Sequence, residues 1–293
     1  MFMLTRRALL YRFAAGTVLA SARPAFVWAA DESSAFRSRI ASLESRHGGR
    51  IGVSVFDTGS DQNLTHRGHT RFSMCSTVKW PLVALILSRV DAGHESLDRT
   101  IDYSAAELVT YSPETKKHVD SGMRLGAICR AGLTQSDNTA ANLMFDAVGG
   151  PAALTAFIRS LGDDVTRSDR LETALNEPAP GHRQDTTTPI AMTGLMRRVL
   201  FGDVLRQQSK QQLIDWMRAN QTGDKRLRAG LPNDWQIGDK TGSGGNNTAA
   251  DIAIASHEHD APILISVYYT GSNATPAERD EIIADVGRAI VTR

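Results

Sequence analysis

Strand-like segments occur near both ends of this 293-residue chain, and this distribution constrains the fold more than any other feature. Residues 50–57 alternate in hydropathy as a strand does, and a turn at 57–60 predicts a second strand reaching Phe72. The middle of the chain, from about 97 to 220, is largely helical and rich in loops. Further strands are predicted late in the chain, at 235–243, 249–256 and 262–270. The sequence therefore predicts one antiparallel sheet built from both ends of the chain.

Helices are predicted at the two ends of the same sequence. Apolar residues at helical spacing predict a first helix between Ser34 and His47, and a capping box at 275–278 begins the last one. These terminal helices would cover the sheet, which gives an α+β fold with an inserted all-helical lobe. We expect the α/β lobe at about 30–75 and 221–293, and the helical lobe at about 76–220.

The first 29 residues have the pattern of an export signal. Arg6 and Arg7 precede an apolar run at 13–20 that is too short to remain as a membrane span, and Val27 and Ala29 offer small side chains at the places expected for cleavage. The adjacent arginines indicate the twin-arginine route, with an amphipathic N-terminal helix as the alternative. We predict a periplasmic protein that begins near Ala30 or Asp31.

The charge balance indicates which partners to expect. The formal net charge is +1 and no basic stripe stands out, which argues against broad nucleic-acid binding. The eight histidines show no zinc spacing, so we expect neither a metal nor a cofactor.

We also expect a monomer, because the sequence carries no obvious oligomerisation signal.

Ser76-Thr77-Val78-Lys79 precedes an apolar run at 80–87 that suits a buried helix. At a helix start, unpaired backbone N–H groups and the helix dipole favour developing negative charge near Ser76. Lys79 would lie one turn along the same face. If that face is buried, desolvation lowers the lysine pKa, and Lys79 can then accept the serine proton. The alternative is a serine-capped helix with a solvated lysine.

A second motif, Ser136-Asp137-Asn138, opens a predicted helix. Asp137 is a good capping residue, so the motif is compatible with a simple capping turn. In the functional interpretation, the Ser136 hydroxyl passes a proton to a leaving nitrogen and the Asn138 amide holds a substrate carbonyl.

A third motif, Lys240-Thr241-Gly242-Ser243, ends a predicted strand. It is compatible with an exposed edge strand that breaks at glycine. Functionally, Lys240 and Thr241 would attract a substrate carboxylate, and Gly242 would allow close approach of a ligand. The backbone N–H of Ser243 would pair with that of Ser76 as an oxyanion hole.

Together, in this order and at these separations, the motifs resemble the serine β-lactamase and penicillin-binding protein superfamily. Residues 170–176 look like the ω loop of class A β-lactamases, and the resemblance spans nearly all of the mature chain. It implies that Glu172 and Asn176 hold the deacylating water, and that Arg170 pairs with Asp185.

The resemblance implies hydrolysis of penicillin- and cephalosporin-type antibiotics, which confers resistance. Ser76 would form the acyl-enzyme, Ser136 would protonate the lactam nitrogen, and Lys79 and Lys240 would assist electrostatically. Glu172 would then activate water. Whether Lys79 or Glu172 is the base for acylation stays open.

Other positions match the family less specifically. Tyr111 falls where the family has an aromatic gatekeeper, although an exposed loop tyrosine is the alternative. Arg226 matches an arginine that binds the substrate carboxylate in some members, and Ala249 replaces the other family arginine; a solvated arginine at a helix end is the alternative. Thr173 departs from the proline that many members carry, which puts the local loop geometry in doubt.

The cysteines are Cys75 and Cys129, which we expect to be unpaired and buried. Many class A carbapenemases join the cysteine before the nucleophile to one just after Lys-Thr-Gly. Residues 243–245 here lack that cysteine, so the mark of this subgroup is absent.

Two rivals share parts of this pattern. A penicillin-trapped D,D-peptidase has the first three motifs, but Glu172 and Asn176 favour efficient deacylation. A β-lactam sensor that stays acylated would need a membrane span or partner domain, and the sequence suggests neither.

Overall fold

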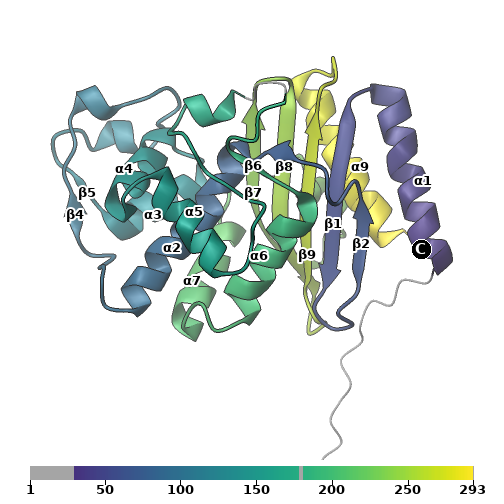
Figure 1. The fold of residues 1–293 in the computed structure, drawn as a ribbon, viewed down its shortest axis with the longest axis horizontal. Helices are drawn as coiled ribbons and strands as arrows, with labels where there is room; N and C mark the ends of the chain where they lie inside the picture. Colours follow the sequence, from purple (N-terminus) through teal and green to yellow (C-terminus); the bar gives the residue numbers. More distant parts are fainter. Residues whose placement is uncertain (1–29, 178–180, 293) are drawn as a thin grey trace, which may run out of the picture.

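The computed structural model describes residues 30–177 and 181–292, so the predicted export signal at 1–29 lies outside the described residues. A five-stranded antiparallel sheet forms the centre of the fold, in the order β2-β1-β9-β8-β7 (Figure 1). Strand β1 from the start of the chain pairs along its whole length with β9 from the end. The prediction of a sheet built from both chain ends is confirmed. The strands are β1 Arg50–Asp57, β2 Asn63–His66, β7 Trp235–Gly244, β8 Thr248–His257 and β9 Ile263–Thr270.

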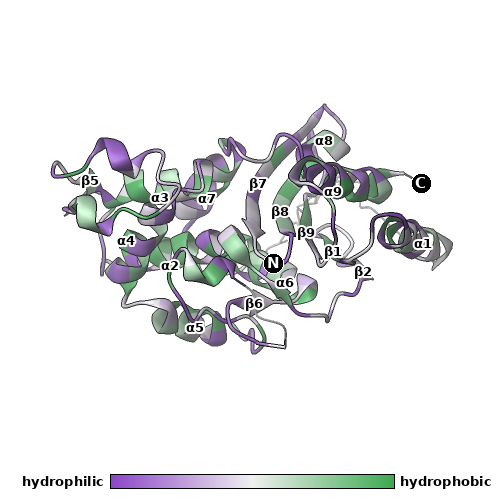
Figure 2. Cartoon of the chain, turned by 90° about the horizontal axis from the view of Figure 1, so that it is seen from above, coloured by the Kyte–Doolittle hydropathy of each residue, from purple (hydrophilic) through white to green (hydrophobic). Residues whose placement is uncertain are grey.

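The two terminal helices, α1 (Ala30–His47) and α9 (Pro276–Val291), cover one face of this sheet (Figure 2). Side chains alternate between the faces of a strand, so β1 turns Ile51, Val53 and Val55 towards these helices. Thr275 caps α9 in the predicted capping box. The α+β prediction is confirmed.

The other face of the sheet meets the helical part of the chain. Helix α6 lies within the range expected for the helical lobe, yet it packs against β1 and β9, and Ser266 Oγ donates to the Pro189 carbonyl at 2.8 Å. The helices of this part are α2 Lys79–Asp91, α3 Leu125–Thr134, α4 Asn138–Val148, α5 Pro151–Ser160, α6 Pro189–Phe201 and α7 Gln207–Arg218. The short helix α8 (Leu227–Gly230) instead packs against α9, on the face covered by the terminal helices. A small two-stranded sheet of β4 (Thr100–Ile101) and β5 (Met123–Arg124) lies at its edge.

The predicted second strand is wrong beyond His66. Arg67 adopts a left-handed φ of 47° and the Thr70 N–H bonds back to its carbonyl at 2.9 Å, so the chain turns away from the sheet. Phe72–Ser73 instead forms β3, which pairs with β6 (Thr186–Thr187). This short ladder ties residues just before Ser76 to the end of the ω-like loop.

Within residues 30–177 and 181–292, no single helix is long and apolar enough to cross a membrane, although the bent pair α4 and α5 together would be. Cys75 and Cys129 are both buried and unpaired, as expected. Burial raises the pKa of the Cys75 thiol to about 12, so it stays protonated.

Candidate active site

Ser76 lies in a short 3₁₀ turn, η1 (Cys75–Val78), and not at the start of an α-helix as the sequence suggested. Helix α2 continues from Lys79, and the tight turn brings Lys79 Nζ to 2.7 Å from Ser76 Oγ. Lys79 is fully buried, so the alternative of a solvated lysine is wrong.

The Lys79 ammonium is held by contacts from two other segments, the Ser136–Asn138 motif and the loop that carries Glu172. It donates to Asn138 Oδ1 at 2.7 Å and to the Ser136 carbonyl at 3.0 Å, and lies 2.8 Å from Glu172 Oε1. Burial lowers its pKa, and the Glu172 carboxylate opposes that shift. The lysine is thereby placed to exchange a proton with Ser76.

Lys240, on β7, reaches the same site from the sheet side. Its Nζ donates to Ser136 Oγ at 3.0 Å and to the Thr241 carbonyl at 2.8 Å. Burial, together with the positive charge of Lys79, lowers the Lys240 pKa to about 7. Ser136 therefore lies between two lysines.

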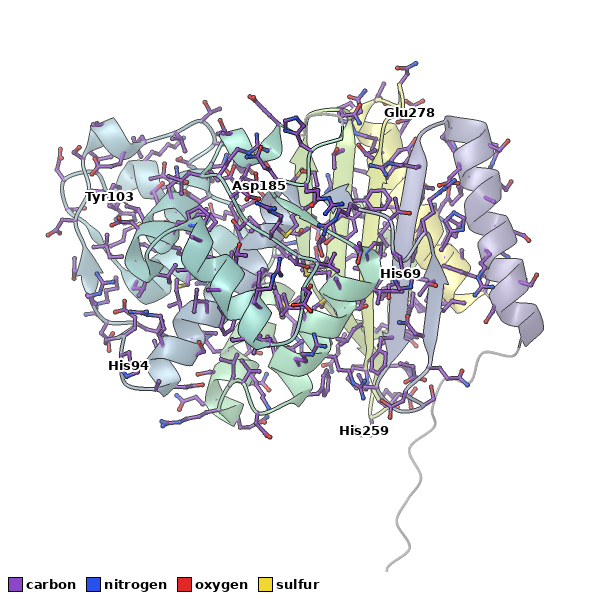
Figure 3. The ribbon with its side chains drawn as sticks, in the orientation of Figure 1. His69, His94, Tyr103, Asp185, His259 and Glu278 are labelled. Carbon is purple, nitrogen blue, oxygen red and sulfur yellow. The ribbon has the colours of Figure 1, made fainter. Side chains whose placement is uncertain are left out.

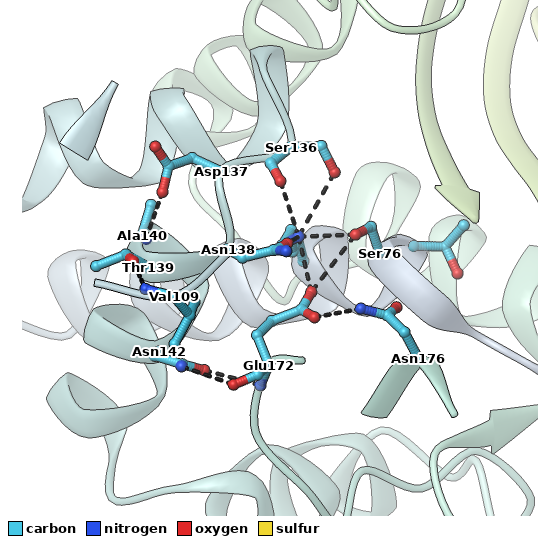
Figure 4. Close-up of polar contacts among 12 residues, drawn as sticks. Ser76, Val109, Ser136, Asp137, Asn138, Thr139, Ala140, Asn142, Glu172 and Asn176 are labelled. Atoms are coloured by element: carbon cyan, nitrogen blue, oxygen red, sulfur yellow. Dashed lines mark hydrogen bonds and ion pairs between the residues drawn. The ribbon is translucent and has the colours of Figure 1, made fainter. Parts of the chain in front are cut away.

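The Glu172 side chain is fully buried, and the residue is fixed at both its carboxylate and its backbone (Figure 4). Asn176 Nδ2 donates a short hydrogen bond to Oε2, and Ser76 Oγ is 3.5 Å from Oε1. Asn142, on α4, donates to the Glu172 carbonyl and accepts from its N–H, both at 2.9 Å. The Glu172–Thr173 peptide bond is cis. The contacts from Asn176 and Asn142 hold the carboxylate beside the Ser76 hydroxyl.

The predicted ion pair between Arg170 and Asp185 is present, with Nε 2.6 Å from Oδ2. Asp185 lies where the loop returns to the sheet (Figure 3), and it is almost fully buried. Its Oδ1 also accepts the N–H groups of Asp169 and Arg170, at 2.7 and 3.0 Å. One carboxylate therefore closes both arms of the loop.

Gly242 leaves no room for a side chain, because other parts of the chain pack closely against it. A Cβ at this position would lie 2.8 Å from the Met74 carbonyl oxygen and 3.3 Å from the Ser76 nitrogen. We expected this glycine to admit a ligand, and the structure adds that it lets β7 approach the nucleophile turn. The Ser76 N–H consequently lies beside the strand that carries Ser243.

A hollow of about 360 Å³ joins these groups. Tyr111 lines it and is 57% exposed, and its gatekeeper role stays a prediction. Arg226 also lines it but is buried, so the alternative of a solvated arginine at a helix end is wrong. The lining residues are Ser76, Tyr111, Ser136, Asn138, Asn176, Thr222, Arg226, Thr241, Gly242 and Ser243.

The comparisons with known proteins agree with this geometry. The model of the β-lactamase enzyme family matches residues 35–293. β-Lactamase OXY-2 of Klebsiella oxytoca is 40% identical over 90% of both chains, and β-lactamase L2 of Stenotrophomonas maltophilia is 44% identical over 85% of this chain and 82% of its own. The solved structure of the ancestral (GNCA) class A β-lactamase is 55% identical, with a TM-score of 0.86, and covers 87% of this chain and 98% of its own.

The chain belongs to the class A β-lactamases.

Several residues that shape this class A site were not predicted. Asn142 holds Glu172, Thr222 Oγ1 makes a short hydrogen bond to Thr241 Oγ1, and Asp280 Oδ1 accepts from Arg226 Nε at 2.7 Å. Asn142 is one helical turn after Asn138 on α4, and this spacing was the only available signal.

Four residues around the site adopt left-handed backbone conformations although none is a glycine. Such conformations cost energy and cluster at functional sites. Cys75 (φ 47°) turns the chain just before Ser76, and Tyr111 (φ 66°) turns it at the rim of the hollow. Ser136 (φ 58°) begins the second motif, and Asp185 (φ 53°) is the residue that pairs with Arg170 in the ω loop.

The Arg226 guanidinium has contacts on all three nitrogens. Nη1 donates to the carbonyls of Gly242 and Ala250, both at 2.8 Å, and Nη2 donates to Ser243 Oγ at 2.7 Å. Arg226 therefore fixes the strand end at Ser243 in addition to placing positive charge there. In the described part of the chain, no three metal-ligating side chains are grouped to hold an ion.

Proposed function

We propose that this class A β-lactamase hydrolyses the lactam amide bond of penicillin- and cephalosporin-type antibiotics through an acyl-enzyme on Ser76, which confers resistance. The observation that carries the proposal is the buried cluster in which Ser76 Oγ lies 2.7 Å from Lys79 Nζ and 3.5 Å from Glu172 Oε1. A nucleophile, a proton acceptor and a second base within hydrogen-bond reach are what nucleophilic acyl transfer needs.

In acylation, Ser76 Oγ attacks the lactam carbonyl carbon and loses its proton. Lys79 accepts it directly, or Glu172 accepts it through a water; the contacts at Ser76 suit either base. The oxyanion is held by the backbone N–H groups of Ser76 and Ser243. Removing one such donor typically costs about 3 kcal/mol of barrier. Because the backbone supplies these bonds, side-chain substitution of Ser243 should leave the oxyanion hole intact.

The C–N bond then breaks and the lactam nitrogen takes a proton from Ser136 Oγ. Lys240 donates to that hydroxyl at 3.0 Å and Lys79 lies 3.5 Å from it, so two cations surround the proton donor. Ser136 can regain a proton from either lysine, which completes the transfer without a solvent ion.

Deacylation uses a water between Glu172 and Asn176. Glu172 removes a proton from this water as it attacks the ester carbonyl. The Ser76 oxygen then leaves with a proton from Lys79, 2.7 Å away, and Lys79 recovers that proton from Glu172 at 2.8 Å. Asn176 Nδ2 orients the carboxylate, while Asn176 Oδ1 is buried without a protein partner among the described residues. That free acceptor is suited to hold the water.

Substrate binding is assigned to the rim of the hollow. Lys240, Thr241, Ser243 and Arg226 attract the substrate carboxylate, and Tyr111 contacts the body of the antibiotic. The Asn138 amide has one N–H on the Thr110 carbonyl at 2.8 Å. Its second N–H is available for a substrate carbonyl.

Intact-protein mass spectrometry during turnover of a chromogenic cephalosporin tests the mechanism. The parent should turn over repeatedly, whereas Glu172→Ala should accumulate a stable acyl adduct. Glu177→Ala, on an exposed carboxylate of the same loop, is the matched control and should behave as the parent. A stoichiometric burst with a lasting adduct in the parent would indicate a penicillin-binding protein or sensor.

We further propose export to the periplasm with removal of residues 1–29, and a monomeric mature protein. The basic stretch with Arg6 and Arg7, followed by the apolar run at 13–20, supports the first proposal. Mass spectrometry of the periplasmic fraction should give a chain starting near Ala30 or Asp31, and Arg6→Lys with Arg7→Lys should block a twin-arginine route. Light scattering should give the mass of one protomer.

A further inference from the structure

A hollow of about 690 Å³ lies outside the catalytic hollow and carries a concentration of positive charge. Three arginines line it, and they come from three separate segments: Arg50 from β1, Arg71 from the segment before β3, and Arg183 from the end of the ω loop. His182 also lines it. No aspartate or glutamate is among the described lining residues.

These arginines are not neutralised by ion pairs. Within residues 30–177 and 181–292, no carboxylate lies in ion-pair contact with Arg50 and Arg183, which are exposed, or with Arg71, which is partly buried. Arg71 donates through Nη1 to the Val165 carbonyl at 2.9 Å and to Thr186 Oγ1 at 3.0 Å, which are both neutral acceptors. The other N–H groups of its guanidinium remain for a ligand.

The surroundings increase the positive potential at Arg71. Burial and the neighbouring charges of Arg183, Arg167 and Arg159 lower its pKa, and the charge of Asp163 opposes them. Burial similarly lowers the pKa of Arg50, whose guanidinium lies 4.6 Å from the centre of the Phe72 ring. An anion entering the hollow would relieve this repulsion.

We propose that this hollow binds a phosphate group, either as free phosphate or as a phosphate monoester. Guanidinium groups match the geometry of tetrahedral oxyanions and form paired, charge-assisted hydrogen bonds with them. The volume falls in the usual range of about 300–1,000 Å³ for small-molecule sites, so there is room for an organic group on the ester. Ser73, Thr248 and Thr270 add neutral hydroxyls to the wall.

The site is connected to the catalytic machinery but shares none of its residues. Ser73 pairs with Thr186 in the β3–β6 ladder, and the Met74 N–H donates to the Asp185 carbonyl at 2.9 Å. Figure 3 shows Asp185 near the middle of the molecule, between the sheet and the helical part. A bound phosphate would therefore bridge β1, the approach to Ser76 and the returning arm of the ω loop.

Isothermal titration with inorganic phosphate, at constant ionic strength set by chloride, tests the proposal on the mature enzyme. Saturable binding is expected, and Arg50→Gln with Arg183→Gln should weaken it about ten-fold or more, since each removes a charge-assisted contact. Both side chains are exposed, so the variant is expected to fold. Arg46→Gln, on the exposed side of α1, removes a positive charge elsewhere and should bind as the parent. Arg71→Gln is an independent variant in which phosphate affinity should fall to the same extent.

A second arm distinguishes the sources of the phosphate group. Vesicles that contain phosphatidic acid should sediment the parent but not the Arg50/Arg183 variant if the natural ligand is a lipid phosphate, with phosphatidylcholine vesicles as the control. Saturable phosphate binding without this sedimentation would assign a soluble ligand. Absence of binding in both arms, or equal binding by the parent, the Arg50/Arg183 variant and Arg46→Gln, would overturn the proposal.

Discussion

The Lys79 ammonium lies 2.8 Å from the Glu172 carboxylate, and both side chains are completely shielded from solvent. Removing one partner of a buried ion pair leaves the other charge uncompensated, which typically costs about 3–5 kcal/mol. We therefore expect Lys79→Met to lose acylation and to unfold at lower urea concentration. Adding Glu172→Gln should restore much of the free energy of unfolding without restoring activity. Equal stability of the single and double variants would show that the pair is not coupled.

Lys240 should give the enzyme a basic pH limit. Its pKa is lowered to about 7 by burial and by Lys79, so its charge is lost as the pH rises through that value. For substrates with a carboxylate, kcat/KM should fall on the alkaline side. In Lys240→Arg the alkaline decrease in kcat/KM should be much smaller, because arginine stays protonated. If the alkaline decrease in kcat/KM is the same in Lys240→Arg as in the parent, another group is responsible for it.

The lowered pKa of Lys240 also makes the free energy of unfolding depend on pH in a predictable direction. Between about pH 7 and the ordinary lysine pKa of about 10.4, the unfolded chain holds a proton that native Lys240 has lost. The contribution of Lys240 to the free energy of unfolding therefore increases with pH across this window. Urea unfolding at several pH values should show a smaller increase for Lys240→Met than for the parent.

Asn142 should control deacylation without touching substrate. Its amide satisfies both the N–H and the carbonyl of Glu172, and an unsatisfied buried polar group costs about 1–3 kcal/mol. Asn142→Ala should retain a fast acylation burst and accumulate acyl-enzyme in intact-mass measurements. Glu177→Ala is again the control. Loss of the burst itself would mean that Asn142 acts on Lys79 or Ser76 instead.

Exchanging the charges of Arg170 and Asp185, the ion pair of the ω loop, should not restore the stability that reversing Asp185 alone removes. A simple ion pair would be restored by exchanging Arg170 and Asp185, but Asp185 also accepts two backbone N–H groups that an arginine cannot serve. We expect Arg170→Asp with Asp185→Arg to remain as unstable as Asp185→Arg alone in thermal unfolding. Asp185→Asn should be milder, since its amide oxygen can still accept a backbone N–H. Rescue by the exchange would show that the ion pair dominates.

Local spacing and motif order were sufficient to predict the sheet built from both ends and the core of the site. The Ser76–Lys79 contact follows from residues three apart on one turn, and the Glu172 and Arg170–Asp185 assignments followed from the resemblance. The two-residue β3 strand was missed because it is too short for an alternating pattern. Its pairing with β6 depends on contacts across more than 100 residues, which periodicity does not encode.

The functional interpretation of Gly242 shows a second limit of the sequence. A glycine after Lys-Thr indicates close approach, but the approaching group could have been a ligand or the chain itself. Only the fold identifies the Met74 carbonyl as that group. Asn142 and Thr222 were missed for the same reason, since the partners of an asparagine or a threonine are set by tertiary contacts.

Gly244 couples the strand that carries Ser243 to the ω loop. A Cβ built there would lie 2.5 Å from the Asn176 carbonyl oxygen and 2.7 Å from Cys75 Sγ, so Gly244→Ala must displace one or both. The Gly245 N–H binds the same carbonyl at 2.7 Å, so the shift should move Asn176 and with it the Glu172 carboxylate. We expect slower deacylation and a loss of about 1–3 kcal/mol of stability from overpacking.

The control for this substitution is Gly194→Ala, because a Cβ in that part of α6 would meet no atom within 4 Å. Adding Cys75→Ala to Gly244→Ala should relieve the sulfur contact but leave the carbonyl contact. Stability should therefore recover in the double variant more than the deacylation rate does, as measured by unfolding and single-turnover kinetics. Parallel recovery of both would mean that the Cys75 contact, and not displacement of Asn176, limits the enzyme.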